Sequence, residues 1–90
     1  MPLNLKQIQT LVRSGLFYLT EHAYAEAEGD EFDIYDVEQG ILTGKIRRAW
    51  PRDRKCEIVG SAWDGRQIGV VCRITTAGKV RVITIYEIQF

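Results

Sequence analysis

The spacing of apolar residues predicts helices in the first half of the chain. Leu5, Ile8 and Leu11 recur at helical intervals, and similar stretches continue to residue 44. Three stretches follow a residue that commonly caps helices, and each ends near a glycine. The predicted helices begin after Asn4, Thr20 and Asp33 and end near Gly15, Gly29 and Gly44. The apolar run 16–19 between the first two helices is either an edge strand or a loop that plugs the core.

Beyond residue 44 the apolar residues alternate with other residues, which is the pattern of β-strands. The predicted strands cover residues 46–50, 56–63, 68–75 and 79–88. Turn signals at 64–65 (Asp-Gly) and 77–78 (Ala-Gly) join the last three strands as hairpins. The last strand is apolar on both sides near its end, which favours a position inside the sheet. The predicted fold class is α+β, with two to three N-terminal helices packed on one face of an antiparallel sheet of about four strands.

Length and composition place the chain among single-domain globular proteins. Its 90 residues form one domain (1–90), and 46% hydrophobic with 27% charged residues excludes disordered and coiled-coil classes. We expect a cytoplasmic protein without membrane contact, because no apolar run could span a membrane and no signal peptide pattern opens the chain. Cys56 and Cys72 match no metal or redox spacing, so we expect free thiols, no metal and no cofactor. A disulfide between neighbouring strands is the alternative and would need an oxidising compartment.

The charges are balanced in total but separated along the sequence. There are 12 basic and 12 acidic residues, so the formal net charge is zero. Residues 1–44 hold two basic and eight acidic residues, a net charge of −6, and residues 45–90 hold ten basic and four acidic ones, a net charge of +6. The neutral total argues against a polyanionic partner, but the positive half permits one. The acidic run 21–38 is either solvated helix surface or a docking surface for a basic partner.

The segment 45–55 contains six basic residues, one acidic residue and a tryptophan. Such charges bind a phosphate backbone, and a nearby indole can stack on an unpaired base. The candidate RNA-binding residues are Lys45, Arg47, Arg48, Trp50, Arg52, Arg54 and Lys55. The alternative is a solvated strand pair whose cations protect a sheet edge from aggregation.

Arg73 and Arg81 lie on facing strands of a predicted hairpin. Arginines on an open sheet face can clamp a phosphate bidentately or stabilise charge in phosphoryl transfer. The alternative is cross-strand ion pairing with Glu57 and Glu87.

His22 and Tyr86 are the candidate proton-transfer groups. His22 is the single histidine, and its ordinary pKa of about 6.5 suits general acid or base chemistry. Glu26 lies one helical turn later, where it could orient the imidazole. Two ligands at this spacing do not make a metal site, and a structural histidine is the alternative. Tyr86 is either a core residue or a phenolic proton donor.

Segments 20–23 (TEHA), 33–37 (DIYDV) and 82–86 (VITIY) resemble domain-of-unknown-function family 4258. That family in turn resembles the RelE/ParE and BrnT group of small bacterial toxins. The resemblance implies two or more helices against a curved antiparallel sheet, over about residues 18–88. It implies action on messenger RNA and neutralisation by an antitoxin protein. The matching positions are His22, Ala23, Thr84 and Tyr86.

The function expected from these features is that of a RelE/BrnT-like toxin acting on RNA, by metal-independent cleavage or by binding alone. In the cleavage version, Arg47, Arg48 and Arg73 or Arg81 hold the phosphate and stabilise its developing charge, while His22 or Tyr86 transfers a proton. The alternative function is a non-catalytic interaction module with a degenerate toxin fold. The expected partners are RNA, an antitoxin and a second copy of the chain.

Overall fold

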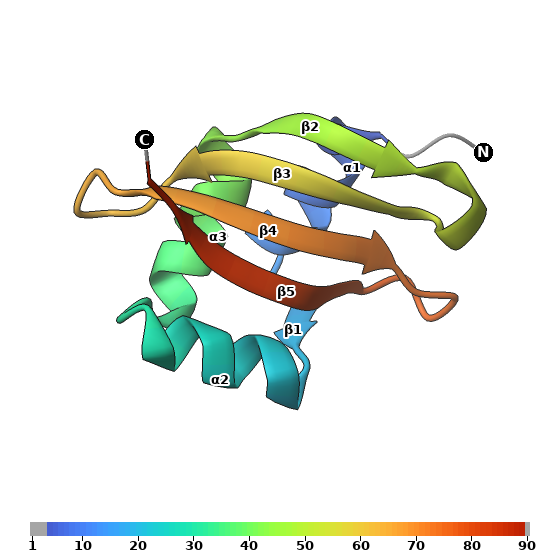
Figure 1. Cartoon of the computed structure of the whole chain (residues 1–90). Coiled ribbons are helices and arrows are strands. Elements are labelled where there is room, and N and C mark those ends of the chain that lie inside the picture. The colour runs from blue at the N-terminus through green and yellow to red at the C-terminus, as the bar shows by residue number, and fades with distance from the viewer. Residues whose placement is uncertain (1–3, 90) are drawn as a thin grey trace.

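The computed structural model describes residues 4–89 as three helices and a five-stranded sheet (Figure 1). In chain order the elements are α1 (Leu5–Arg13), β1 (Phe17–Leu19), α2 (Glu21–Gly29), α3 (Ile34–Thr43), β2 (Lys45–Trp50), the 3-10 turn η1 (Pro51–Asp53), β3 (Lys55–Ser61), β4 (Gln67–Ile74) and β5 (Val80–Ile88). The α+β class and the N-terminal position of the helices are confirmed. No helix in the described part of the chain is long and apolar enough to cross a membrane.

The three predicted capping residues all cap their helices. The side chain of Asn4 accepts from the N–H groups of Lys6 and Gln7, and that of Thr20 accepts from Ala23 N–H. Asp33 accepts from the N–H of Asp36, whose carboxylate accepts from Asp33 N–H in return. Each cap satisfies N–H groups that have no partner inside the helix.

The sheet is mixed and has the strand order β1-β5-β4-β3-β2. Neighbours from β2 to β5 run antiparallel, as expected, and β5 lies inside the sheet between β1 and β4. The prediction of about four antiparallel strands was one strand short, because residues 17–19 form β1, which pairs with β5 in parallel. Three residues are too few to show the alternation that separates a strand from an apolar loop.

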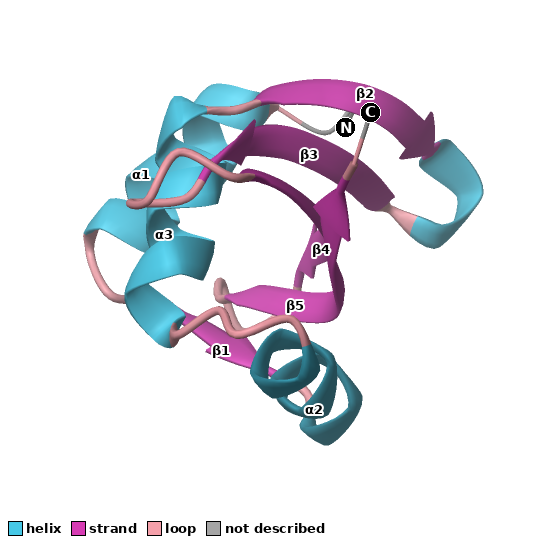
Figure 2. Ribbon diagram, turned by 60° about the vertical axis from the view of Figure 1, so that its left-hand side comes forward, coloured by secondary structure: helices cyan, strands magenta, loops and turns pink. Residues whose placement is uncertain are grey.

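The sheet curls around a core that α1 and α3 cover on its concave side (Figure 2). The buried cluster joins Ile8 and Val12 of α1 to Ile41 of α3 and to inward-facing strand residues such as Ile58 and Val70. The convex face of the sheet carries no helix and faces the viewer in Figure 1. Helix α2 lies along β5 instead of over the centre of the sheet.

Two glycines set the distance between α3 and the sheet. A Cβ atom on Gly60 of β3 would lie 1.9 Å from the carbonyl oxygen of Gly40 in α3, and a Cβ on Gly40 would lie 2.3 Å from Cγ2 of Ile68. Such distances are far shorter than van der Waals contact. Gly40 lowers the helical propensity of α3 by about 1 kcal/mol relative to alanine, and in return it permits this close approach to β3 and β4.

Side chains of α2 cover the part of β5 that extends beyond β1. The carboxylate of Glu26 accepts a hydrogen bond from Ile85 N–H at 3.1 Å, and that of Asp30 accepts from Glu87 N–H at 3.0 Å. The Thr20 hydroxyl donates to the carbonyl of Ile83 at 3.4 Å. Two of the eight carboxylates of the acidic run therefore bind exposed backbone donors of β5, where another strand would otherwise pair.

Candidate nucleic-acid interface

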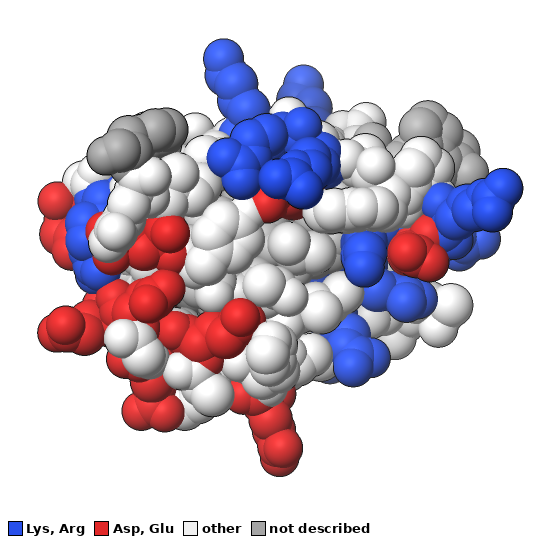
Figure 3. Space-filling model, in the orientation of Figure 1, with Lys and Arg blue, Asp and Glu red and all other residues white. Residues whose placement is uncertain are grey.

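The convex face of the sheet carries the largest group of predicted site residues. Alternation along β3 and β4 turns Cys56 and Ile58 towards the helices, so Lys55 and Glu57 point outwards. Figure 3 views this face and shows Lys and Arg side chains over β2 and around the end of the sheet near η1 and the β4–β5 turn. Asp and Glu side chains gather on the opposite lower side, around α2.

One row of outward-facing residues crosses all five strands. Trp50 pairs with Lys55, Lys55 with Arg73, Arg73 with Arg81, and Arg81 with Tyr18. We call these five residues the cross-strand row. It places three cations side by side, with an aromatic residue at each end. Adjacent strands are about 4.8 Å apart, so the three cationic positions span about 10 Å.

The cations of the cross-strand row are poorly neutralised. Within residues 4–89, Arg73 and Arg81 form no ion pair, and the buried Nε of Arg73 has no hydrogen-bond partner. Lys55 Nζ lies 4.0 Å from Asp53 Oδ2 and 5.2 Å from the centre of the Trp50 ring. Like charges directly opposite each other destabilise a sheet, and a bound anion would remove that cost.

A second cluster on the same face is neutralised from within. Glu57 is almost fully buried and accepts from Arg47 Nε at 2.7 Å, while Arg48 Nε lies 3.6 Å away. The hydrogen bond to Glu57 raises the pKa of Arg47 above its ordinary value. Arg47 Nη2 also donates to the Tyr86 hydroxyl at 3.1 Å. Arg47 lies at a β-bulge between β2 and β3, which allows it and its neighbour Arg48 to approach one carboxylate.

The expected ion pairs of Arg73 and Arg81 with glutamates do not form. Glu57 pairs with Arg47 and Arg48, as described above. Glu87 lies opposite the buried Ile68 and therefore on the helix-covered face, where its carboxylate is 3.4 Å from Arg66 Nη1. The register of β3 and β4 could not be assigned from the sequence, and a shift of one residue moves a side chain to the other face.

The remaining basic residues of the segment 45–55 are exposed. Lys45 begins β2 opposite Val59, Arg52 lies in η1, and Arg54 follows η1 in the left-handed conformation, with φ = 54°. They surround the Trp50 end of the cross-strand row, which extends the positive surface beyond the strands.

His22 lies apart from this surface. It occupies the first turn of α2, is 70% exposed, and its Nε2 is 3.3 Å from Glu26 Oε1. The same carboxylate oxygen accepts from Ile85 N–H, so Glu26 acts first as a cover for β5. The four candidate catalytic residues thus form three separate contacts in the described structure: Arg73 with Arg81, Tyr86 with Arg47, and His22 with Glu26.

Cys56 and Cys72 lie directly opposite each other on β3 and β4, inside the core. Both are free thiols, as expected. The hydrogen bond with Cys56 and burial raise the pKa of Cys72 well above its ordinary value. In the described part of the chain no group of three or more His, Cys, Asp or Glu side chains is placed to hold a metal ion.

The comparison with protein families gives one match. Residues 19–87 match the model of DUF4258, a domain of unknown function. The chain belongs to this family. No curated protein and no solved structure matches it. The matched DUF4258 region extends from the end of β1 into β5 and leaves α1 outside.

Three residues of this DUF4258 domain gained importance only with the structure. Tyr18 lies in a short apolar run, and its place beside Arg81 depends on a pairing between strands 63 positions apart. Glu57 is a charged residue at an outward strand position, which gave no sign of burial. Arg66 follows a predicted turn, yet its guanidinium stacks on Phe32 at 4.2 Å and donates to the carbonyl of Asp30 at 2.7 Å.

Proposed function

We propose that this DUF4258 protein binds single-stranded RNA across the convex face of its sheet, as a RelE/BrnT-like toxin that an antitoxin neutralises. The cross-strand row is the observation that carries the proposal. Guanidinium groups bind phosphate through paired hydrogen bonds, and aromatic side chains stack on unpaired bases regardless of sequence. The row provides both kinds of contact, with its cations in the middle and Trp50 and Tyr18 at its ends.

The absence of a neutralising carboxylate within the row distinguishes it from an ordinary charged surface. A sheet edge protected by cations needs scattered charges, whereas this row aligns three cations on adjacent strands. The orphaned Nε of Arg73 adds a buried donor that an incoming phosphate oxygen would satisfy. RNA binding therefore offsets two costs that the free protein carries.

RNA cleavage without a metal is the catalytic form of this proposal. Arg73 and Arg81 would hold the scissile phosphate, and Arg47 and Arg48 would stabilise charge nearby. Tyr86 is favoured over His22 for proton transfer, because its hydroxyl contacts Arg47 on the same face.

Binding of a labelled single-stranded RNA at several salt concentrations tests the proposal. The double variant R73A/R81A should bind at least about tenfold more weakly, and the slope of log affinity against log salt should fall by about 2. The control K6A/R13A removes the same charge from exposed positions of α1 and should bind like the wild type. Equal RNA affinity of R73A/R81A and the wild type would refute the proposal.

Cleavage is tested separately, by incubating RNA with the protein in the presence of a chelator. Cleavage by the wild type that is lost in Y86F and retained in H22A would support the assignment of Tyr86. Intact RNA after incubation with a protein that binds it would eliminate the catalytic form and leave RNA binding in place.

A non-catalytic interaction module is the second candidate, favoured by the separation of charge in Figure 3. In this alternative the acidic helices of one copy meet the basic strands of another. A dimer that dissociates as salt is added, with no affinity for RNA, would support it over the first proposal.

A further inference from the structure

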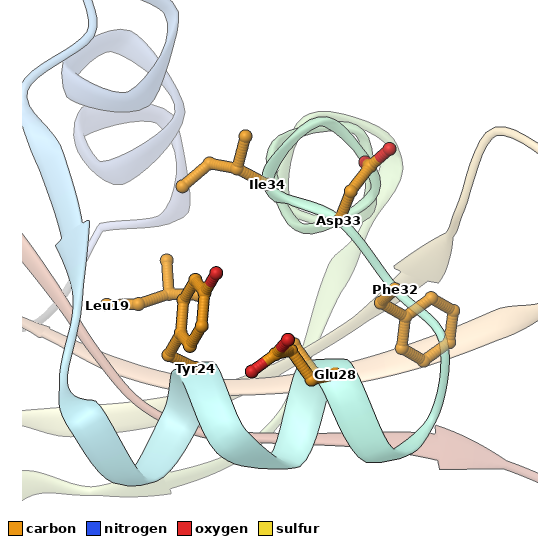
Figure 4. Close-up of a pocket in the computed structure, with 7 residues that line it drawn as sticks. Leu19, Tyr24, Glu28, Phe32, Asp33 and Ile34 are labelled. Carbon is orange, nitrogen blue, oxygen red and sulfur yellow. The ribbon is translucent and has the colours of Figure 1, made fainter.

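A cavity of about 410 Å³ opens between α2, β1 and the start of α3 (Figure 4). Its walls are largely apolar and include Leu19, Tyr24, Phe32 and Ile34. The cavity lies away from the cross-strand row: Leu19 faces the core side of β1, whereas Tyr18 faces outwards. Its volume falls within the range of pockets that bind ligands or partner side chains.

The apolar residues at the mouth of the cavity are exposed. Tyr24 of α2 is 59% exposed and Ile34 of α3 is 44% exposed. In Figure 4 the two side chains project from opposite helices towards the same space. Large apolar groups around a hollow mark a surface that can bury them against a partner.

The charge around the cavity selects the partner. Glu28 and Asp33 line it, and residues 14–44 contain no Lys or Arg. Arg66 approaches from the sheet, but its guanidinium stacks on Phe32 and binds the carbonyls of Asp30 and Glu31. Within residues 4–89, neither Glu28 nor Asp33 forms an ion pair. An occupant with apolar side chains and positive charge would complement both features.

The acidic surface continues along α2 beyond the cavity. Glu21, Tyr24 and Glu28 are spaced by three and four residues and therefore share one face of the helix. The seven positions between the two glutamates span about 10 Å of helix. A strip of this length fits several consecutive residues of a chain better than one small cation.

We propose that this cavity is a docking site for a basic, apolar peptide segment of a partner protein. An aliphatic or aromatic side chain enters between Tyr24 and Ile34, and flanking Lys or Arg residues pair with Glu28 and Glu21. The basic residues 45–55 of a second copy do not fit this description, because they belong to β2, η1 and β3 of the folded sheet. The occupant is therefore a different chain.

Selection from a library of random peptides tests this proposal directly. Peptides that bind the immobilised protein should be enriched in Lys or Arg next to Leu, Ile, Phe or Trp. Affinities of selected peptides, measured by fluorescence anisotropy, should fall at least about tenfold for Y24A and for E28K.

Two variants serve as matched controls. Y35A removes an equally exposed tyrosine, 65% exposed, that does not line the cavity. D53K makes the same charge change as E28K, but in η1. Both should keep peptide affinity within about threefold of the wild type.

Several outcomes would overturn the proposal. Failure to select any peptide, or selection of peptides without basic residues, would do so. Equal losses for E28K and D53K would reduce the effect to net charge alone. A dimer that depends on Tyr24 would make a second copy the occupant, and binding of simple aromatic amines in place of any peptide would make it a small molecule.

Discussion

At the scale of single residues, the glycines of this protein differ in what they permit. Gly60 lies against the backbone of Gly40, and Gly69 lies beneath the ring of Tyr86, so a Cβ there would be 2.4 Å from the ring. Gly29 ends α2 with open space around it and an ordinary negative φ. Backbone cannot move aside as a side chain can, so the three positions should respond differently to the same substitution.

Alanine at these three positions should therefore give a graded series of stabilities, measured by denaturant unfolding. G60A should lower the free energy of unfolding most, by about 3 kcal/mol or more, because α3 must separate from β3. G69A should cost about 1–3 kcal/mol, because Tyr86 must move and lose its contact with Arg47. G29A should be neutral or stabilising by up to about 1 kcal/mol. A loss in G29A as large as that in G60A would contradict the role assigned to these contacts.

At the scale of elements, α2 acts as a cover for β5 as well as part of the core. Its buried Ala23 and Ala27 pack inwards, while Glu26 and Asp30 reach the backbone of β5. Exposed strand edges can pair with other chains, and these carboxylates occupy the donors that such pairing needs.

Substitution of Glu26 tests this role. E26A should lower the free energy of unfolding by about 1–3 kcal/mol, because Ile85 N–H loses its partner. E26Q retains an acceptor oxygen and should lose less. Hydrogen exchange should show faster exchange at the Ile85 amide in E26A, and an unchanged rate there would contradict the hydrogen bond.

The elements also show how far the sequence reaches. Caps, helix spacing and turn signals predicted three helices and four strands, because each signal is local. The β1 strand was left open because its assignment depends on a partner more than 60 residues away. The predicted site divided in the same way: clustering of basic residues in 45–55 was visible, but the alignment of Lys55, Arg73 and Arg81 depends on strand register.

At the scale of the whole molecule, zero net charge conceals two surfaces of opposite sign (Figure 3). Salt screens charges over about 10 Å at 0.1 M, so at low salt a flat, charged resin should bind each surface separately. The formal charge is thus a poor guide to the interactions of this protein.

Ion-exchange chromatography near neutral pH and at low salt should make this visible. The wild type should be retained on both cation and anion exchangers, because each resin meets one surface. R73A/R81A should elute earlier from the cation exchanger. E28K should elute earlier from the anion exchanger. Passage through both resins without retention would contradict the separation of charge.

The parallel pairing of β1 with β5 constrains the order in which the protein can fold. β5 contacts α1, β1, α2 and β4, although it follows all of them in the sequence. During synthesis, β1 and the capping side chains of α2 therefore have no partner until β5 has left the ribosome. Contacts between distant segments form slowly, and the apolar faces of the early helices stay exposed in the meantime. The last strand thus completes both the sheet and the protection of the first half of the chain.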